Sequence, residues 1–230
     1  MVQRVKQLKI NSKKLFKMKR VSVLLIVMLF VSALMAQNSS IRVESQGKGD
    51  PVIFLPGFTC PASVFDSTIE NIKGNHKFVK ITYAGFAGVP AVELPWYPKL
   101  VEDISKYISD NKLENITVIG HSMGGNLAMD LASKFGKKVN KMILIDAIPC
   151  MRELMMPGSD ASAISYESPY NKQMYEMKDE AFKQVARMMS TNMTSRAENV
   201  DLLMKWITES DRKTYVYGYT DLLKLDCRPG

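Results

Sequence analysis

The sequence has 230 residues, of which 46% are hydrophobic and 23% are charged, so it can form one sizeable core. Its formal net charge of +8 would suit a protein that binds nucleic acid, but residues 1–36 hold eight of the basic residues and no acidic one. The rest of the chain is neutral and has no basic stripe with interleaved aromatic residues. The charge pattern therefore argues against nucleic-acid binding.

The basic leader contains a continuous apolar run, residues 21–35 (VSVLLIVMLFVSALM), preceded by Lys17, Lys19 and Arg20. A helix of this length spans about 22 Å, which is less than the roughly 30 Å hydrocarbon core of a bilayer. A basic segment, a short apolar run and a small residue at Ala36 are typical of a secretory signal peptide. We predict cleavage near Ala36 and export to the periplasm or the cell exterior; the alternative is an uncleaved membrane anchor.

After the leader, apolar strands alternate with amphipathic helices. Strands are predicted at residues 41–45, 51–55, 77–83, 116–119 and 139–145. Helices are predicted at residues 62–72, 99–111 and 124–135, and the first of them should bury Val64, Phe65, Ile69 and Ile72 on one face. This alternation indicates βαβ units and an α/β fold with a mostly parallel sheet flanked by helices. The runs PVIFL, ITVI and MILI suit strands that are buried on both faces.

The pattern changes at about Met151. The following segment has no strand-like run, contains nine of the 16 methionines, and shows helical spacing at residues 176–189 and 200–207. We interpret it as a helical cap inserted after a sheet strand, with a helix at residues 214–225 leading back to the sheet. Because thioethers adapt to varied apolar ligands, the cap is expected to line an apolar acyl pocket. The predicted organisation is a signal peptide at 1–36, a core at 37–150, a cap at 151–210 and a return to the core at 211–230.

The strongest functional signal is Gly120-His121-Ser122-Met123-Gly124, which lies between the strand ITVI and the helix that follows it. A nucleophile on a tight strand-to-helix turn projects above the edge of a sheet, and the flanking glycines Gly120 and Gly124 allow that turn. The start of the helix behind Ser122 also favours developing negative charge. The pattern predicts that Ser122 is a nucleophile.

Acyl transfer also needs two hydrogen-bond donors for the developing oxyanion. One donor is the backbone N–H of Met123, the residue after the nucleophile. The other is expected from the loop after an earlier strand, where Leu55-Pro56-Gly57-Phe58 stands, so we assign it to the Phe58 N–H.

Four segments, PVIFLPGF, ITYAGFAG, GHSMGG and KMILIDAIP, make the chain from about residue 41 onward resemble the α/β-hydrolase superfamily, in its branch with a helical cap. The resemblance implies an eight-stranded, mostly parallel sheet and a Ser–acid–His triad whose members follow in that order along the chain. Pro56 departs from the pattern, because many relatives have His before the glycine. The departure does not affect the donor assigned to Phe58.

The sequence contains no histidine at the position where the triad requires one. His121 precedes the nucleophile and should point away from it, and His76 begins a strand roughly 20 Å from the catalytic edge. We therefore expect that the chain stops before the catalytic acid and histidine, that the last strands are missing, and that the chain as given is an inactive fragment. Asp146, which ends a sheet strand, is a weak candidate for the acid; a structural role at a turn is the alternative.

Two classes of function remain open. The first is a serine hydrolase of esters or related acyl compounds, and the residues do not separate esterase from lipase, thioesterase or peptidase. The second is a noncatalytic binding protein with the same fold. The sequence shows no metal-ligand cluster or dinucleotide motif, so no cofactor is expected; the expected partner is a small acyl substrate, and membrane contact would come only from the leader. Three cysteines, Cys60, Cys150 and Cys227, do not make a paired framework; one disulfide is possible in an oxidising compartment, but none is predicted, because most isolated cysteines are buried small apolar residues.

Overall fold

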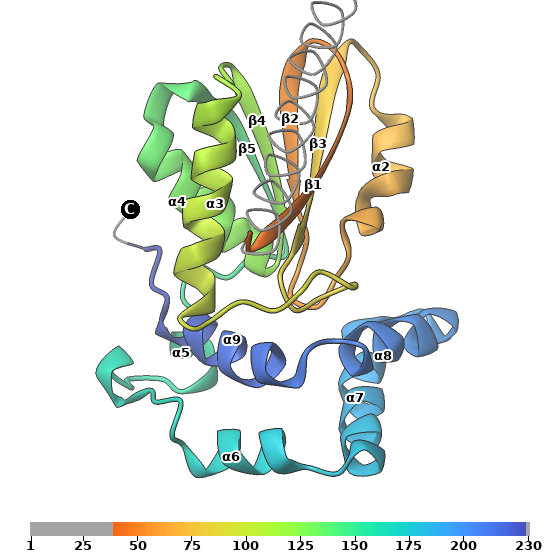
Figure 1. The fold of residues 1–230 in the computed structure, drawn as a ribbon, viewed down its shortest axis with the longest axis vertical. Helices are drawn as coiled ribbons and strands as arrows, with labels where there is room; N and C mark the ends of the chain where they lie inside the picture. The colour runs from red at the N-terminus through yellow and green to blue at the C-terminus, as the bar shows by residue number, and fades with distance from the viewer. Residues whose placement is uncertain (1–38, 229–230) are drawn as a thin grey trace, which may run out of the picture. The chain divides into compact units, whose positions relative to one another are not determined.

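The computed structural model describes residues 39–228, and a five-stranded sheet forms the centre of this part of the chain (Figure 1). The strand order is β1-β3-β2-β4-β5, with β1 antiparallel to β3 and every other pair parallel. The strands are β1 Ile41–Gly47, β2 Asp50–Leu55, β3 His76–Tyr83, β4 Ile116–His121 and β5 Val139–Ile145. All five predicted strands are therefore present, with ends that differ by up to two residues.

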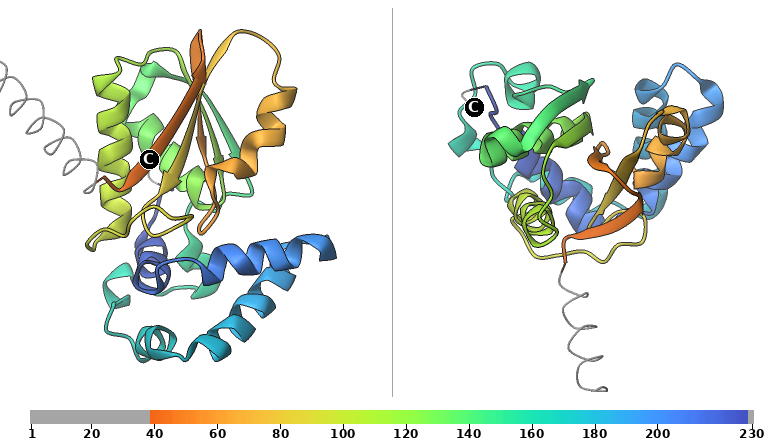
Figure 2. Two further views of the ribbon diagram at one scale, coloured as in Figure 1. Left: turned by 45° about the vertical axis from the view of Figure 1, so that its right-hand side comes forward. Right: turned by 90° about the horizontal axis from the view of Figure 1, so that it is seen from above.

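Helices cover both faces of the sheet. Alternate residues of each strand point to opposite faces, so a strand with a continuous apolar run packs against helices on both sides. In β2, Ile53 and Leu55 pack on the same side as the two helices α3 and α4, whereas Val52 and Phe54 face the helix α2. Figure 2 shows α2 on the opposite side of the sheet from α3. The bounds are α2 Asp66–Asn71, α3 Trp96–Asp110 and α4 Met123–Phe135, with the short 3₁₀ turns η1 Ala62–Phe65 and η2 Gly136–Lys138. Both faces of β2 are thus buried, as its continuous apolar run predicts.

The segment after β5 is helical, and it lies beyond the carboxyl ends of the parallel strands (Figure 1). It consists of α5 Met151–Met155, η3 Ala161–Ala163, α6 Pro169–Glu176, α7 Asp179–Met193, η4 Ala197–Asn199, α8 Val200–Thr208 and α9 Arg212–Lys224. The segment has its own apolar cluster, which includes Phe182, Ile207 and Tyr215. At the other end of α9, Leu222 joins the main core below the sheet.

Two of the predicted helices are interrupted in the structure. The helix predicted at 62–72 is divided into η1 and α2, and Val64, which was expected to be buried, is 38% exposed. The helix predicted at 176–189 is interrupted, because Met177 and Lys178 have extended ψ angles of 134° and 145°. Asp179 and Glu180 then begin α7, where two acidic residues complement the positive end of the helix dipole.

The strand β5 is an edge of the sheet among the described residues, and it pairs only with β4. Its residues Met142, Ile143, Leu144 and Ile145 are each between 40% and 46% exposed. The apolar sequence that favours a buried strand therefore lies at the surface in this part of the protein. The predicted signal peptide lies outside the described residues, and no helix among residues 39–228 is long and apolar enough to cross a membrane.

Candidate active site

Ser122 occupies a sharp turn between β4 and α4. Its backbone angles, φ 52° and ψ −122°, lie in a region that residues other than glycine rarely adopt. Hydrogen bonds hold the turn on both sides: the Ser122 N–H donates to the Ile145 carbonyl at 2.9 Å, and the Ser122 carbonyl accepts from the Gly125 N–H at 2.8 Å. A strained serine between a strand and a helix is the geometry of a nucleophile elbow.

The glycines around the turn allow very close backbone contact. A Cβ atom on Gly120 would lie 2.2 Å from the Gly124 carbonyl oxygen, and a Cβ atom on Gly124 would lie 1.9 Å from the Leu55 carbonyl oxygen. A Cβ atom on Gly57 would be 3.4 Å from the Ser122 Cβ. The start of α4 and the end of β2 therefore approach each other at a distance that a side chain on Gly124 would prevent.

The two predicted oxyanion donors flank this contact. Met123 is the first residue of α4, so its N–H has no acceptor within the helix. The Phe58 N–H belongs to the loop that touches Ser122 through Gly57. In the part of the chain that the structure describes, the N–H groups of Met123 and Phe58 have no hydrogen-bond partner. The same is true of the Ser122 hydroxyl among these residues. The two N–H groups thus flank Ser122 and have no backbone acceptor within residues 39–228.

The Phe58 side chain fixes this loop to the rest of the protein. Its ring contacts Phe86 at a centroid distance of 4.9 Å and Trp96 at 5.7 Å, both edge to face, and both belong to the main core. On its other side it contacts the α9 residues Tyr215 at 5.8 Å and Tyr219 at 5.9 Å. One aromatic cluster therefore joins the main core, the loop after β2 (hereafter the predicted oxyanion loop) and α9.

Neither of the two described histidines, His76 and His121, forms a hydrogen bond with Ser122. The His121 imidazole lies beside the predicted oxyanion loop, with Nδ1 3.0 Å from the position that a Cβ atom on Gly57 would take. Burial lowers the pKa of His121, and the negative charge of Asp146 opposes that shift. His76 begins β3 and pairs with Asp50 at the amino end of β2, which is the end of the sheet remote from the elbow.

Asp146 comes directly after β5 and has a φ of 49°. Because the carbonyl of Ile145 binds the Ser122 N–H, the backbone of Asp146 lies next to the elbow. Its charge acts on the imidazole of His121, and no described histidine links it to Ser122. A role for Asp146 as a triad acid stays a prediction.

Asp221 is a buried carboxylate that the sequence analysis missed. It lies on α9 and is 5% exposed. Its Oδ2 accepts hydrogen bonds from the N–H groups of Trp96 at 2.7 Å and Tyr97 at 3.1 Å, and its Oδ1 accepts one from the Tyr166 hydroxyl. Asp221 therefore caps the first turn of α3, which begins three residues before the predicted start. The carboxylate that caps α3 lies more than 120 residues further along the chain, so no local sequence pattern could reveal it.

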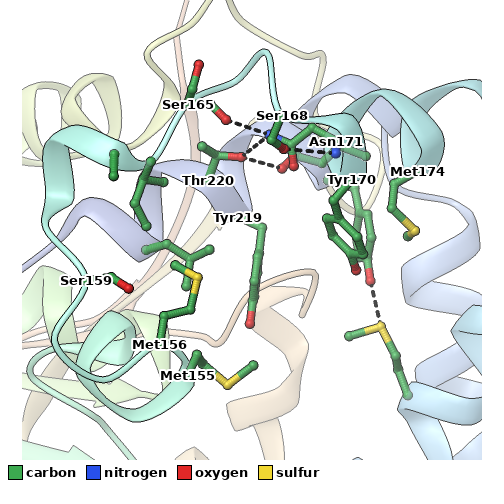
Figure 3. A pocket seen from close by; sticks show the side chains of 16 residues that line it. Met155, Met156, Ser159, Ser165, Ser168, Tyr170, Asn171, Met174, Tyr219 and Thr220 are labelled. Carbon is green, nitrogen blue, oxygen red and sulfur yellow. Dashed lines mark hydrogen bonds between the residues drawn. The ribbon is translucent and has the colours of Figure 1, made fainter.

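A cavity of about 520 Å³ lies within the cap and against α9 (Figure 3). Its wall is mostly apolar and aromatic, and it includes Met155, Met156, Met174, Met189, Tyr170, Tyr215 and Tyr219. Asn171 and Thr220 form a polar patch in the wall, where the Asn171 amide donates to the Thr220 hydroxyl at 2.9 Å (Figure 3).

The cavity reaches the loop after β2 through aromatic rings and does not include Ser122. Ser122 is not part of the cavity wall, whereas Tyr215 and Tyr219 line the cavity and contact the Phe58 ring. The Tyr215 hydroxyl donates to the sulfur of Met189 at 3.0 Å, and burial raises the pKa of Tyr215 to about 12. Tyr215 is therefore a neutral, fixed wall residue between the cavity and the Phe58 ring. Among residues 39–228, no three His, Cys, Asp or Glu side chains are grouped so that they could hold a metal ion.

Comparison with known proteins supports the fold that these features define. The family described as "alpha/beta hydrolase fold" matches residues 92–203. An esterase from Exiguobacterium antarcticum is similar in structure, with a TM-score of 0.62 and 21% identity over 83% of this chain and 72% of its own. A hydrolase from Pseudomonas aeruginosa has a TM-score of 0.66 and 11% identity over 82% of this chain and 70% of its own. The chain has an α/β-hydrolase fold, and the predicted fold class is confirmed.

Curated relatives match over a shorter region. The AB hydrolase superfamily protein YisY of Bacillus subtilis is 29% identical over 117 residues, which are 48% of this chain and 42% of that protein. The pimeloyl-[acyl-carrier protein] methyl ester esterase of Nitrosomonas europaea is 23% identical over 112 residues, which are 49% of this chain and 43% of that protein. The matched segment thus spans less than half the length of either relative.

Proposed function

We propose that the protein is a serine hydrolase of an ester or related acyl substrate, with Ser122 as the nucleophile. The observation that carries the proposal is the strained turn at Ser122 beside the free N–H groups of Phe58 and Met123. In the proposed reaction, Ser122 Oγ attacks the acyl carbonyl carbon, and the two N–H groups stabilise the oxyanion. The alcohol then leaves, and water hydrolyses the acyl-enzyme.

The general base is the component that these residues do not supply. Neither His76 nor His121 hydrogen-bonds to Ser122 in the described part of the chain, and the sequence has no other histidine. No general base is therefore assigned among the described residues, and Asp146 is retained as a candidate acid. Loss of one triad member lowers turnover by about 10⁴–10⁶-fold. The 230 residues alone are therefore expected to be nearly inactive.

The nucleophile is tested with a fluorophosphonate probe, which forms an adduct with an activated serine. The protein made from its own gene in its own cells should carry the adduct on Ser122. Ser122→Ala should carry none, while Ser133→Ala, a change on the exposed face of α4, should label normally. An adduct that persists in Ser122→Ala rules out this nucleophile. Rapid Ser122-dependent labelling of the 230 residues alone would show that the base lies within them.

We further propose that the cavity in the cap binds the apolar acyl part of the substrate. Its methionine and tyrosine wall suits an aliphatic chain, and the rings of Tyr215 and Tyr219 place it next to the predicted oxyanion loop. Ala163→Phe should fill the cavity, because Ala163 is an exposed wall residue. Ser162→Phe is the matched control, since Ser162 is exposed and is not part of the wall.

The measurement is displacement of a fluorescent fatty acid, which requires no turnover. Affinity should rise with chain length from acetate to decanoate and should fall at least tenfold in Ala163→Phe but not in Ser162→Phe. Binding that is strongest for acetate, or equal in both variants, contradicts the proposal.

A noncatalytic binding protein is the alternative, and one observation favours it: the cavity is complete without Ser122. The two functions give opposite results in one experiment. If the protein only binds ligands, Ser122→Ala leaves fatty-acid binding unchanged, and neither the original protein nor the variant hydrolyses esters. If the protein is a hydrolase, Ser122→Ala keeps fatty-acid binding and loses ester hydrolysis.

We also propose that the mature protein is exported. The support is the basic and apolar leader, which suits a signal peptide. Amino-terminal sequencing of the protein from the cell envelope or medium should begin at Gln37. A sequence that begins at Met1 or Met18, in a membrane fraction, would indicate the uncleaved anchor instead.

A further inference from the structure

Two of the three cysteines lie on adjacent backbone segments at the base of the cap. Cys150 follows β5 and precedes α5, while Cys227 follows α9. The Cys227 N–H donates to the carbonyl of Pro149 at 2.9 Å, and Cys150 is the next residue. This contact joins the point where the chain enters the cap to the point where it leaves.

Standard bond lengths set an upper limit on the separation of these two residues. From the Cys227 Cα to its nitrogen, across the hydrogen bond, and from the Pro149 oxygen to the Cys150 Cα, the path is roughly 7 Å long. The direct Cα–Cα distance must be shorter, because the path is bent. Disulfides join residues whose Cα atoms are about 4.4–6.8 Å apart, and the upper limit set by this hydrogen bond is compatible with that range.

Other contacts hold the two segments in this position. The Asn126 amide donates both to the Ile148 carbonyl at 2.9 Å and to the Cys227 sulfur at 3.7 Å. Arg152, which is buried, donates to the Leu223 carbonyl at 3.1 Å. Burial is the main cause of the raised pKa of Cys227, and the neighbouring thiol of Cys150 also contributes to the shift. The backbone contact and these side-chain contacts therefore hold the two cysteines on neighbouring segments.

We propose that Cys150 and Cys227 form a disulfide that closes the cap at its base. The oxidant is a low-molecular-weight disulfide such as oxidised glutathione. The thiolate of Cys227, the more exposed of the two, attacks one oxidant sulfur, the oxidant S–S bond breaks, and one thiol is released. The thiolate of Cys150 then attacks the Cys227 sulfur and releases the second thiol. Two cysteine thiols are oxidised, and one oxidant disulfide is reduced to two thiols.

Cys60 is excluded from this pair by its position. It lies in the loop after β2, where burial raises its pKa to about 11, so it forms little thiolate at neutral pH. The disulfide would enclose residues 151–226, which make up the whole cap and α9. A link between the two ends of this segment restricts the unfolded chain and keeps the cap attached to the sheet.

The test uses the full chain, equilibrated with oxidised and reduced glutathione, alkylated and digested without reduction. Mass spectrometry should find the Cys150 and Cys227 peptides joined and Cys60 alkylated. Reduction should lower the melting temperature by roughly 5–15 °C. Cys60→Ser should keep the link and the shift. The double variant Cys150→Ala, Cys227→Ala should melt with the reduced protein and be insensitive to reductant.

Three free thiols after oxidation would overturn the proposal, and so would a link that includes Cys60 or that joins two chains. A link between Cys150 and Cys227 without any change in melting temperature would overturn the stabilising role. Neither readout depends on Ser122 or on hydrolysis.

Discussion

Gly124 is the residue at which the strand β2, the helix α4 and the elbow come closest together. An alanine in the first turn of a helix usually stabilises by about 1 kcal/mol relative to glycine. Here the added methyl group would lie 1.9 Å from the Leu55 carbonyl oxygen, so α4 would have to move away from β2. We expect Gly124→Ala to lower the free energy of unfolding by about 3 kcal/mol and to abolish probe labelling of Ser122.

Urea unfolding followed by circular dichroism measures this change. The control is Ser133→Ala, which adds helix propensity on the exposed face of α4 and should be neutral or slightly stabilising. If Gly124→Ala were as stable as this control, the close contact between β2 and α4 would be absent in solution.

His121 gives the protein a specific dependence on pH. Burial holds its pKa below the ordinary value of 6.5, so the unfolded chain takes up a proton at higher pH than the folded chain does. The stabilisation is fully present above about pH 6.5 and is lost as the pH falls below that value. We expect the urea midpoint to decrease between pH 8 and pH 5.5, and to decrease less in His121→Gln.

Asp146 offers an independent check of the same effect. Its charge raises the pKa of His121, in opposition to burial. Asp146→Asn should therefore lower that pKa further, and the loss of stability should continue to lower pH than in the original protein. An identical pH profile in both variants would mean that His121 does not titrate with folding.

The candidate site could be predicted at those residues whose roles are set by local sequence. Ser122 and Met123 lie within one strand–turn–helix motif, and Phe58 lies at the end of another strand, so their positions follow from the order of the elements. Asp221 could not be predicted, because its partners are Trp96 and Tyr97, which lie in a different helix. A buried carboxylate on α9 has no sequence pattern that distinguishes it from a surface one.

At the scale of elements, α3 depends on α9 for its first turn. The carboxylate of Asp221 accepts the two N–H groups at the start of α3, which would otherwise be buried without acceptors. Asp221→Ala should therefore cost about 1–3 kcal/mol of stability and shorten α3 at its beginning. Hydrogen exchange of the Trp96 and Tyr97 amides should become much faster.

Asp110→Ala is the matched control for this prediction. Asp110 ends the same helix and forms an exposed ion pair with Lys106 at 2.7 Å, a type of interaction that contributes well under 1 kcal/mol. Asp221→Asn keeps one acceptor oxygen and should have an intermediate effect. Equal stability of the Asp221→Ala and Asp110→Ala proteins would show that α3 does not need this cap.

The ends of elements were predicted less well than their existence, and each difference has a physical cause. The start of α3 was missed because the carboxylate that caps it, Asp221, lies on α9. The helix expected at 176–189 was divided because hydrophobic spacing continues across Met177 and Lys178, where the backbone is extended. Within the cap, periodicity identified helices but could not show how they enclose a cavity, since that depends on contacts between α6, α7 and α9.

For the whole molecule, a mostly parallel sheet with two covered faces follows from alternating strands and helices, but the order of the strands and the exposure of β5 do not. The run MILI predicts a strand buried on both faces, and the structure places it at an edge. The apolar pattern indicates that the two faces of a strand need to be buried, but it does not identify the elements that bury them. The same limit applies to the general base: the proposed role of Ser122 requires one, and sequence pattern does not identify the residue that provides it.

The exposed edge should determine how the chain behaves in solution. Met142, Ile143, Leu144 and Ile145 give β5 two apolar faces and an edge that can pair with another strand. We expect residues 37–230 to self-associate at tens of micromolar. Ile143→Lys should shift the mass measured by size-exclusion chromatography with light scattering toward the monomer, because it places a charge on the edge strand, 46% exposed. Val64→Lys, a change at a 38% exposed valine on η1, should leave association unchanged. A chain that remains a monomer at about 100 μM without any substitution would show that β5 is not a site of association.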